Sequence, residues 1–300
     1  MKDKWLSFFL AFLLVFSCAK VTEEKRAQLA IEYYTEGMRA FANRDYKKAI
    51  EKLKESLKYL ENFTPSQIKE IKMALSESYY LSKDYINAIV YMEDFLFNYP
   101  EARESEKIYY LLIDSYMKVA PDAYRDQSYT YVAIEKAKDF LNKYPESPYK
   151  DKVLEIIEKA EKKLADHEYL VGKFYEEYGF YYSASLRYRD LLINYPEQIS
   201  QADVLYRYIK SLLLVEKQAE KRKKAYKSWI EEAKKSLKEA KTEEDRRAVE
   251  KRIAFLEEQI SRWDSLAKSS KEEGIRLMQR YKELYGENTY YRELERLAEK

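Results

Sequence analysis

Apolar residues along most of the chain recur with the three- and four-residue spacing of amphipathic helices, and the helical segments themselves repeat. Three segments end in the same Tyr-Pro pair, and each has an alanine twelve residues before its proline. The prolines are Pro100, Pro145 and Pro196, and the alanines are Ala88, Ala133 and Ala184. Proline ends a helix because it lacks a backbone N–H, whereas alanine lets a second helix approach closely. The pattern predicts successive pairs of packed helices.

Small and aromatic residues at other fixed offsets extend this repeat toward the N-terminus. Tyrosines lie three residues before three alanines, namely Tyr46 before Ala49, Tyr85 before Ala88 and Tyr181 before Ala184. Gly37 and Gly172 lie twelve residues before Ala49 and Ala184, and Ser76 has the same position before Ala88. The arrangement resembles the tetratricopeptide repeat. It implies an all-α superhelix of about five helix-turn-helix units, each of about 34 residues.

The C-terminal third contains two apolar runs that predict an inserted helical hairpin. The first run is Tyr226, Ile230, Ala233, Leu237 and Ala240, and the second is Val249, Ile253, Leu256, Ile260, Trp263 and Ala267. Alternating steps of four and three place one apolar seam on each helix, and Thr242 marks the start of the second. We expect an antiparallel hairpin inserted between the two helices of a fifth unit, with Gly286 ending the second of those helices.

The N-terminal segment has the pattern of a secretory signal. Two lysines precede the apolar run of residues 5–16, which is too short to span a membrane as a helix. Val15-Phe16-Ser17-Cys18 resembles a bacterial lipobox, and this implies lipidation of Cys18. Several acyl chains would anchor the protein stably. The alternative is an ordinary signal sequence or a buried helix with a free cysteine.

These patterns divide the chain into six segments. Two helix starts carry an N-cap residue followed by proline, at Thr64-Pro65 and Ser147-Pro148. The expected segments are a signal peptide (1–17), a lipidated cysteine with a flexible tether (18–28), repeat units one to three (29–147), unit four with the first helix of unit five (148–215), the hairpin insertion (216–270), and the second helix of unit five with a C-terminal cap (271–300).

The composition favours an all-α binding protein and excludes several functions. Five glycines and six prolines in 300 residues are too few for a Gly-rich phosphate loop or a turn-rich sheet protein. One histidine and one cysteine exclude most zinc sites and any disulfide framework. No nucleophile elbow or other catalytic motif is present, and no acid–base cluster converges in the sequence. We therefore expect neither enzyme activity nor a metal or cofactor.

Charge and aromatic content point to protein partners. The net charge of +2 produces no overall field that would attract nucleic acid. The basic run at residues 221–224 is more typical of a solvated helix face than of a nucleic-acid patch. The 31 tyrosines suit helix interfaces and protein-binding surfaces, where one end of the side chain is apolar and the other is wet.

Junction motifs carry a resemblance to a known family. They are Asp126-Gln127 before Ala133, Tyr144-Pro145-Glu146-Ser147-Pro148-Tyr149, and Leu164-Ala165-Asp166-His167-Glu168. With the lipobox and the repeats, they resemble the BamD family of lipoproteins of the β-barrel assembly machinery. The resemblance covers about residues 15 to 215, and the hairpin departs from it. Its motif positions here are Asp126, Gln127, His167 and Glu168.

The resemblance implies a non-catalytic, lipid-anchored scaffold on the periplasmic face of the outer membrane. In this family the scaffold holds a POTRA domain of the barrel-forming subunit BamA, accompanies other assembly-complex lipoproteins, and meets the C-terminal strands of unfolded barrel proteins. By position, Arg187 matches the arginine that contacts BamA; without the resemblance it is an ordinary helix-surface cation. The alternative is another periplasmic tetratricopeptide lipoprotein, one that coordinates peptidoglycan synthesis or cell-envelope constriction.

Tyrosines of the first helices are candidates for a peptide-binding groove. Stacked helix pairs form a concave face, on which Tyr33, Tyr79 and Tyr80 would present their rings to an extended, aromatic-ended peptide. The alternative for each of these tyrosines is packing between helix pairs.

Overall fold

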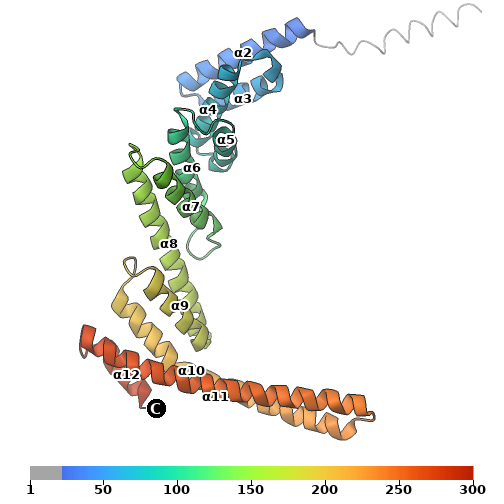
Figure 1. Ribbon diagram of the computed structural model, residues 1–300, viewed down its shortest axis with the longest axis vertical. Helices are drawn as coiled ribbons and strands as arrows, with labels where there is room; N and C mark the ends of the chain where they lie inside the picture. The colour runs from blue at the N-terminus through green and yellow to red at the C-terminus, as the bar shows by residue number, and fades with distance from the viewer. Residues whose placement is uncertain (1–21, 300) are drawn as a thin grey trace, which may run out of the picture. The chain divides into compact units, whose positions relative to one another are not determined.

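The computed structural model describes residues 22–299, and these residues form helices and connecting turns without a strand. The helices are α2 (Glu23–Ala42), α3 (Tyr46–Ser56), the 3₁₀ helix η1 (Leu57–Asn62), α4 (Pro65–Leu81), α5 (Tyr85–Asn98), α6 (Ser105–Val119), α7 (Ser128–Lys143), α8 (Lys150–Glu177), α9 (Tyr181–Asn194), α10 (Gln201–Glu239), α11 (Glu243–Tyr285) and α12 (Thr289–Ala298) (Figure 1). The all-α, tetratricopeptide-like fold class is thus confirmed. The expected signal peptide and Cys18 lie outside the described residues.

Three turns between paired helices share one backbone geometry. A residue in the left-handed region precedes the second helix of each pair, and these residues are Arg44 (φ 62°), Lys83 (φ 68°) and Gly179 (φ 76°). The following residue then donates its backbone N–H to a carbonyl five residues earlier, at 2.8–2.9 Å in all three turns. Asp45 and Asp84 cap α3 and α5 by accepting backbone N–H bonds. The repeat seen in the sequence is therefore a repeat of turn structure as well.

The small residues lie where two helices cross closely. Ala88, Ala133 and Ala184 are fully buried. A Cβ added to Gly37 would lie 2.7 Å from Leu53 Cδ2, and one added to Gly172 would lie 2.7 Å from Tyr188 Cε1. Real Cβ atoms do not tolerate such contacts, so the predicted close approach within a helix pair is confirmed.

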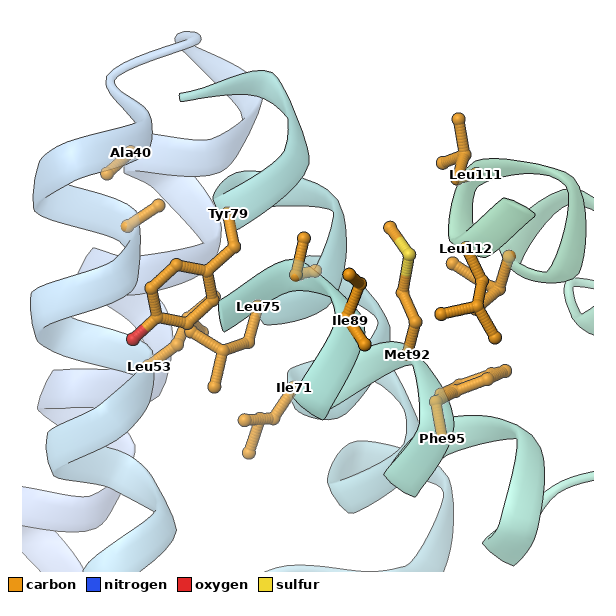
Figure 2. Packing of buried hydrophobic residues seen from close by; sticks show 14 of the residues in the cluster. Ala40, Leu53, Ile71, Leu75, Tyr79, Ile89, Met92, Phe95, Leu111 and Leu112 are labelled. Carbon is orange, nitrogen blue, oxygen red and sulfur yellow. The ribbon is translucent and has the colours of Figure 1, made fainter. Parts of the chain in front are cut away.

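The described helices belong to two compact units. The first unit runs to Ala120 and includes Tyr131–Ile157, and the second comprises Pro121–Thr130 and the chain from Glu158 onward. In the first unit, successive helices enclose a continuous apolar core, and Figure 2 shows Leu53, Leu75 and the Tyr79 ring within it. A smaller cluster around Phe140 and Val153 completes that unit.

The second unit combines helix pairs with a long hairpin. Tyr188, Leu191 and Leu212 are buried in one cluster, and Tyr281 and Leu294 are buried in another. Helices α10 and α11 run antiparallel and stay side by side through the hairpin (Figure 1). Both helices are continuous across residues 216 and 270, where the sequence suggested segment boundaries. The five boundaries between the six expected segments stay predictions.

Tyrosine hydroxyls join the first helices of successive pairs. The donors and carboxylate acceptors are Tyr34 and Glu70 (α2 to α4, 2.8 Å), Tyr80 and Asp114 (α4 to α6, 2.8 Å), and Tyr169 and Asp203 (α8 to α10, 2.9 Å). The sequence separations of 36, 34 and 34 residues match one repeat period. Bonds to a charged acceptor contribute about 1.5–3 kcal/mol each when partly buried. This recurring link explains part of the high tyrosine content.

Candidate functional site

Gln127 closes the loop that leads into α7 in the second unit. Its side chain is buried, and Nε2 donates to the backbone carbonyls of Asp122 and Arg125, both at 2.9 Å. Its Oε1 accepts a bond from the Thr130 hydroxyl at 2.8 Å. An amide is suited to this position because it donates and accepts at the same time. One side chain thereby fixes both the loop and the first turn of α7.

Two side chains of α8 hold the same loop from the other side. His167 Nδ1 lies 2.6 Å from the carbonyl oxygen of Ala123, a bond that requires the proton on Nδ1. Lys163 donates to the carbonyl oxygen of Pro121 at 3.0 Å. Asp126 is exposed and accepts the backbone N–H of Ser128 at 3.0 Å, and its hydrogen bonds with Ser128 lower the pKa of its carboxyl group. The motif positions Gln127 and His167 thus meet at one loop.

Glu168 and Arg187 form an ion pair beside this loop. Arg187 of α9 donates through one terminal nitrogen to Glu168 Oε2 of α8 at 2.9 Å, and its side chain is still 41% exposed. Partial burial of the guanidinium disfavours its charge, but Glu168 and the Tyr175 hydroxyl outweigh that effect and raise the pKa of Arg187. Arg187 is therefore a cation that Glu168 holds in place while part of its side chain stays exposed to solvent.

An apolar pocket adjoins this ion pair. It has a volume of about 220 Å³, and its walls are Ala123, Tyr124, His167, Leu170, Val171, Phe174 and Tyr175. We call it the aromatic pocket. Tyr175 belongs both to this wall and to the surroundings of Arg187. Tyr124 and Phe174 are exposed at its rim. A charged donor next to an open aromatic surface is the composition expected of a protein-binding hot spot.

A buried polar network supports α8 beneath the site, and sequence reasoning missed it. Glu176 accepts the Tyr188 hydroxyl at 2.9 Å and a bond from Arg207 at 3.1 Å, and Arg207 also binds Asp203 at 3.1 Å. Burial and the adjacent carboxylate of Glu176 raise the pKa of Tyr188. The network locks the C-terminal half of α8 against α9 and α10. One sequence feature could have indicated this network. Arg207 lies on the mostly apolar face of α10, where a charged side chain needs polar partners.

The groove candidates of the first unit differ in exposure. Tyr79 is 5% exposed and stacks on Tyr91 with ring centroids 5.0 Å apart, so it is a packing residue, as the alternative interpretation proposed. Tyr80 is half-buried and bound to Asp114. Tyr33 is half-buried, stacks on Tyr59 at 6.3 Å and lies under the ammonium group of Lys52. Two of the three rings thus keep some accessible surface.

The first unit also has an open pocket that the sequence did not indicate. Its volume is about 410 Å³, and its lining consists of Glu93, Leu96, Phe97, Pro100, Tyr109, Leu112, Lys136, Lys143 and Tyr144. Phe97 is almost fully exposed. Lys143 donates to the carbonyl oxygen of Pro100 at 3.1 Å, which fixes one cation at the rim. Aromatic rings and two lysines thus share this surface.

Residues 22–299 show neither the ligand clusters of a metal site nor the long apolar helices of a membrane span. In this range no group of histidine and acidic side chains is arranged to hold a metal ion. None of the helices in the same range is both long and apolar enough to cross a membrane.

Comparisons with known proteins agree with the motifs. A family model described as "YfiO: Outer membrane lipoprotein" matches residues 26–227. A protein of Aquifex aeolicus (strain VF5) named "Putative outer membrane protein assembly factor BamD" is 50% identical over 291 residues, which cover 97% of this chain and 95% of that protein. The chain therefore belongs to the BamD family of outer membrane lipoproteins.

Proposed function

We propose that this protein is a non-catalytic scaffold of the β-barrel assembly complex, and that it binds BamA and assists the insertion of barrel proteins into the outer membrane. Its membership of the BamD family and the name of the Aquifex relative support the assembly role. The observation that carries BamA binding is the state of Arg187, which is fixed by Glu168 and open to solvent beside the aromatic pocket.

The geometry suits the capture of an acidic protein surface. Arg187 donates to Glu168 and also interacts with the Tyr175 hydroxyl, and the exposed part of its planar guanidinium can still donate to a carboxylate of the partner. Glu168 already restricts the rotamers of Arg187, and this reduces the entropy lost on binding. Tyr124 and Phe174 at the pocket rim would bury apolar area around that ion pair.

A second contact would hold barrel precursors on the first unit. Tyr33 and Tyr80 keep accessible ring surface, and the pocket at Phe97 adds the cations Lys136 and Lys143. Lys136 is paired with Glu93 at 3.3 Å and Lys143 with Glu101 at 3.2 Å, so the terminal carboxylate of an extended strand would join these ion pairs while its aromatic residue packs on the rings. Membrane attachment would occur through lipid on Cys18, consistent with the lipoprotein description of the family.

A charge reversal with a matched neighbour tests BamA binding. Arg187→Glu would face Glu168 and repel the same carboxylate of BamA, so the Kd for the BamA periplasmic domains should rise at least about tenfold. Arg189→Glu is the control, because Arg189 is on the same helix, is similarly exposed and forms its ion pair with the adjacent Asp190. Isothermal titration calorimetry gives both values, and circular dichroism checks the helix content.

Two results would contradict the proposal. The first is equal affinity of the Arg187→Glu and Arg189→Glu proteins for BamA. The second is an unchanged amount of folded barrel proteins in the outer membrane after depletion. Recovery of murein enzymes in place of BamA on a tagged protein would favour a scaffold of peptidoglycan synthesis.

A further inference from the structure

The hairpin formed by the distal parts of α10 and α11 extends past the region shared with the family model. That match ends at residue 227, whereas α10 continues to Glu239 and α11 returns from Glu243. The Aquifex relative aligns over 97% of the chain, so the hairpin is not peculiar to this protein. The proposed function uses none of it.

Two large aromatic side chains lie exposed on this hairpin. Trp229 is 43% exposed and Phe255 is 57% exposed, although each directly precedes a buried residue, Ile230 and Leu256 respectively. Each ring leaves a large apolar area in contact with water, and burial of that area against a partner would be favourable.

Ion pairs between the two helices of the hairpin place Trp229 and Phe255 at about the same position along its length. Lys271 binds Glu216 at 3.3 Å, and Lys223 binds Asp264 at 2.6 Å. When the same antiparallel pairing of residues is extended toward the tip, Ile230 of α10 lies opposite Leu256 of α11. In an antiparallel pair of helices, residues that precede facing core positions point to the same side. Trp229 and Phe255 therefore share one side of the hairpin.

On this side of the hairpin, side-chain contacts connect α10 with the aromatic pocket. Arg222 lies seven residues before Trp229, on the same face of α10, and its guanidinium is 5.9 Å from the centroid of the Phe180 ring. Phe180 contacts Tyr175, a wall of the pocket, with ring centroids 6.3 Å apart. Tyr178, 65% exposed, packs against Phe174 with the ring centroids 4.6 Å apart and the rings tilted by 37°.

These contacts link the hairpin to the aromatic pocket and outline one surface of the second unit. We call it the aromatic band, and it consists of Tyr124, Phe174, Tyr178, Phe180, Trp229 and Phe255. Arg187 lies beside one end and Arg222 interrupts it. The outer hairpin adds positive charge, since residues 221–252 contain 13 lysines and arginines against seven acidic residues while the whole chain has a net charge of only +2. Aromatic and arginine side chains are the residues that dominate protein interfaces.

We propose that the hairpin extends the BamA-binding surface: the partner domain that engages Arg187 also covers Trp229 and Phe255 with apolar and acidic side chains. The inference rests on the proposed function. A protein partner is favoured over a membrane because Arg222, which lies over the Phe180 ring, links the side of the hairpin that carries the two rings to the pocket beside Arg187, where a folded domain with a carboxylate fits. The positive charge of the hairpin would complement the acidic side of that domain.

Truncation of the two hairpin rings tests this surface in the full-length protein. Trp229→Ala and Phe255→Ala should each weaken binding of the BamA periplasmic domains about tenfold or more, as removal of an interface hot spot does. Leu284→Ala is the matched control, because Leu284 is an equally exposed apolar residue of α11 outside the band. All three side chains are exposed, so melting temperatures should stay close to that of the unchanged protein. Trp229→Phe should restore most of the affinity.

Each outcome has one meaning. Hairpin variants that bind BamA like the Leu284→Ala protein, while Arg187→Glu loses affinity, overturn the hairpin inference and leave the proposed function standing. If the protein without any substitution does not bind BamA, both the proposed function and the hairpin inference are wrong. Binding to vesicles of phosphatidylethanolamine and phosphatidylglycerol is the third measurement. If the hairpin variants lose vesicle binding and keep their BamA affinity, the hairpin contacts the membrane, and its assignment to BamA is overturned.

Discussion

Gly172 lies where α8 closely approaches the Tyr188 ring of α9, so Gly172→Ala should destabilise the protein. The new Cβ would lie 2.7, 3.0 and 3.1 Å from three ring carbons of Tyr188. That ring cannot move aside, because it is fully buried and its hydroxyl is bound to Glu176. Overpacking of this kind costs about 1–3 kcal/mol, and the better helix propensity of alanine returns about 1 kcal/mol. We expect a net loss of up to about 2 kcal/mol in the free energy of unfolding.

Gly274→Ala is the matched control for this substitution. It gives the same gain in backbone propensity, but the new Cβ would meet Leu213 Cδ2 at 3.1 Å, at the end of a flexible side chain that can shift. The free energy of unfolding should stay unchanged or rise by up to about 1 kcal/mol. The difference between the two variants therefore isolates the packing term at Tyr188.

Urea unfolding gives the comparison directly. Trp229 and Trp263 are both in the second unit, so their fluorescence reports the unit that contains both glycines. The midpoint should fall for Gly172→Ala at an unchanged slope. If Gly172→Ala proves as stable as Gly274→Ala, the helices do not cross as closely as the structure shows, and the explanation of the small residues is wrong.

Two further predictions concern the loop and the tyrosines. Gln127→Ala should lower the free energy of unfolding by about 1–3 kcal/mol, because two backbone carbonyls and a hydroxyl lose a buried partner. Hydrogen exchange should also accelerate at residues 121–127. An unchanged exchange rate would show that the loop does not depend on Gln127. Burial raises the pKa of Tyr206 from 10.0 to about 12, so the folded state keeps a proton that the unfolded state loses. Its stabilising effect is complete below pH 10 and disappears as the pH rises toward 12, and Tyr206→Phe should make the fall of melting temperature over this interval shallower. An equal slope in both proteins would place the alkaline transition at other groups.

Much of the helix-pair structure could be predicted because its determinants are local. Thr64 and Gln67 form the expected capping box, with the Gln67 side chain accepting the Thr64 N–H at 2.9 Å. The helix crossings leave room only for small side chains, so the alanines and glycines at these positions can be recognised from a single sequence. The regular helix α8 begins at Lys150, two residues after Pro148, because residues 147–150 form a preceding turn in which Ser147 accepts the Tyr149 N–H.

The site was harder to predict because it depends on contacts between distant segments. Gln127 and His167 were marked only by a family motif, and nothing local shows that they hold the same loop from 40 residues apart. Tyr79 and Tyr80 are adjacent on α4, yet one packs inward and the other binds Asp114, since a turn of about 100° separates their directions. The exposed rings of the band come from helices far apart in sequence, and only the fold brings them together.

The uninterrupted course of α10 and α11 makes the length of the hairpin adjustable in discrete steps. No flexible joint separates the projecting arms from the helices at their base. Seven residues complete two turns, so removing or adding one heptad in each arm changes the reach by about 10 Å and leaves the outer end facing the same direction. A change of three or four residues in one arm would instead rotate the tip or misalign the seam. Evolution can thus tune how far this projection extends without redesigning the body that carries it.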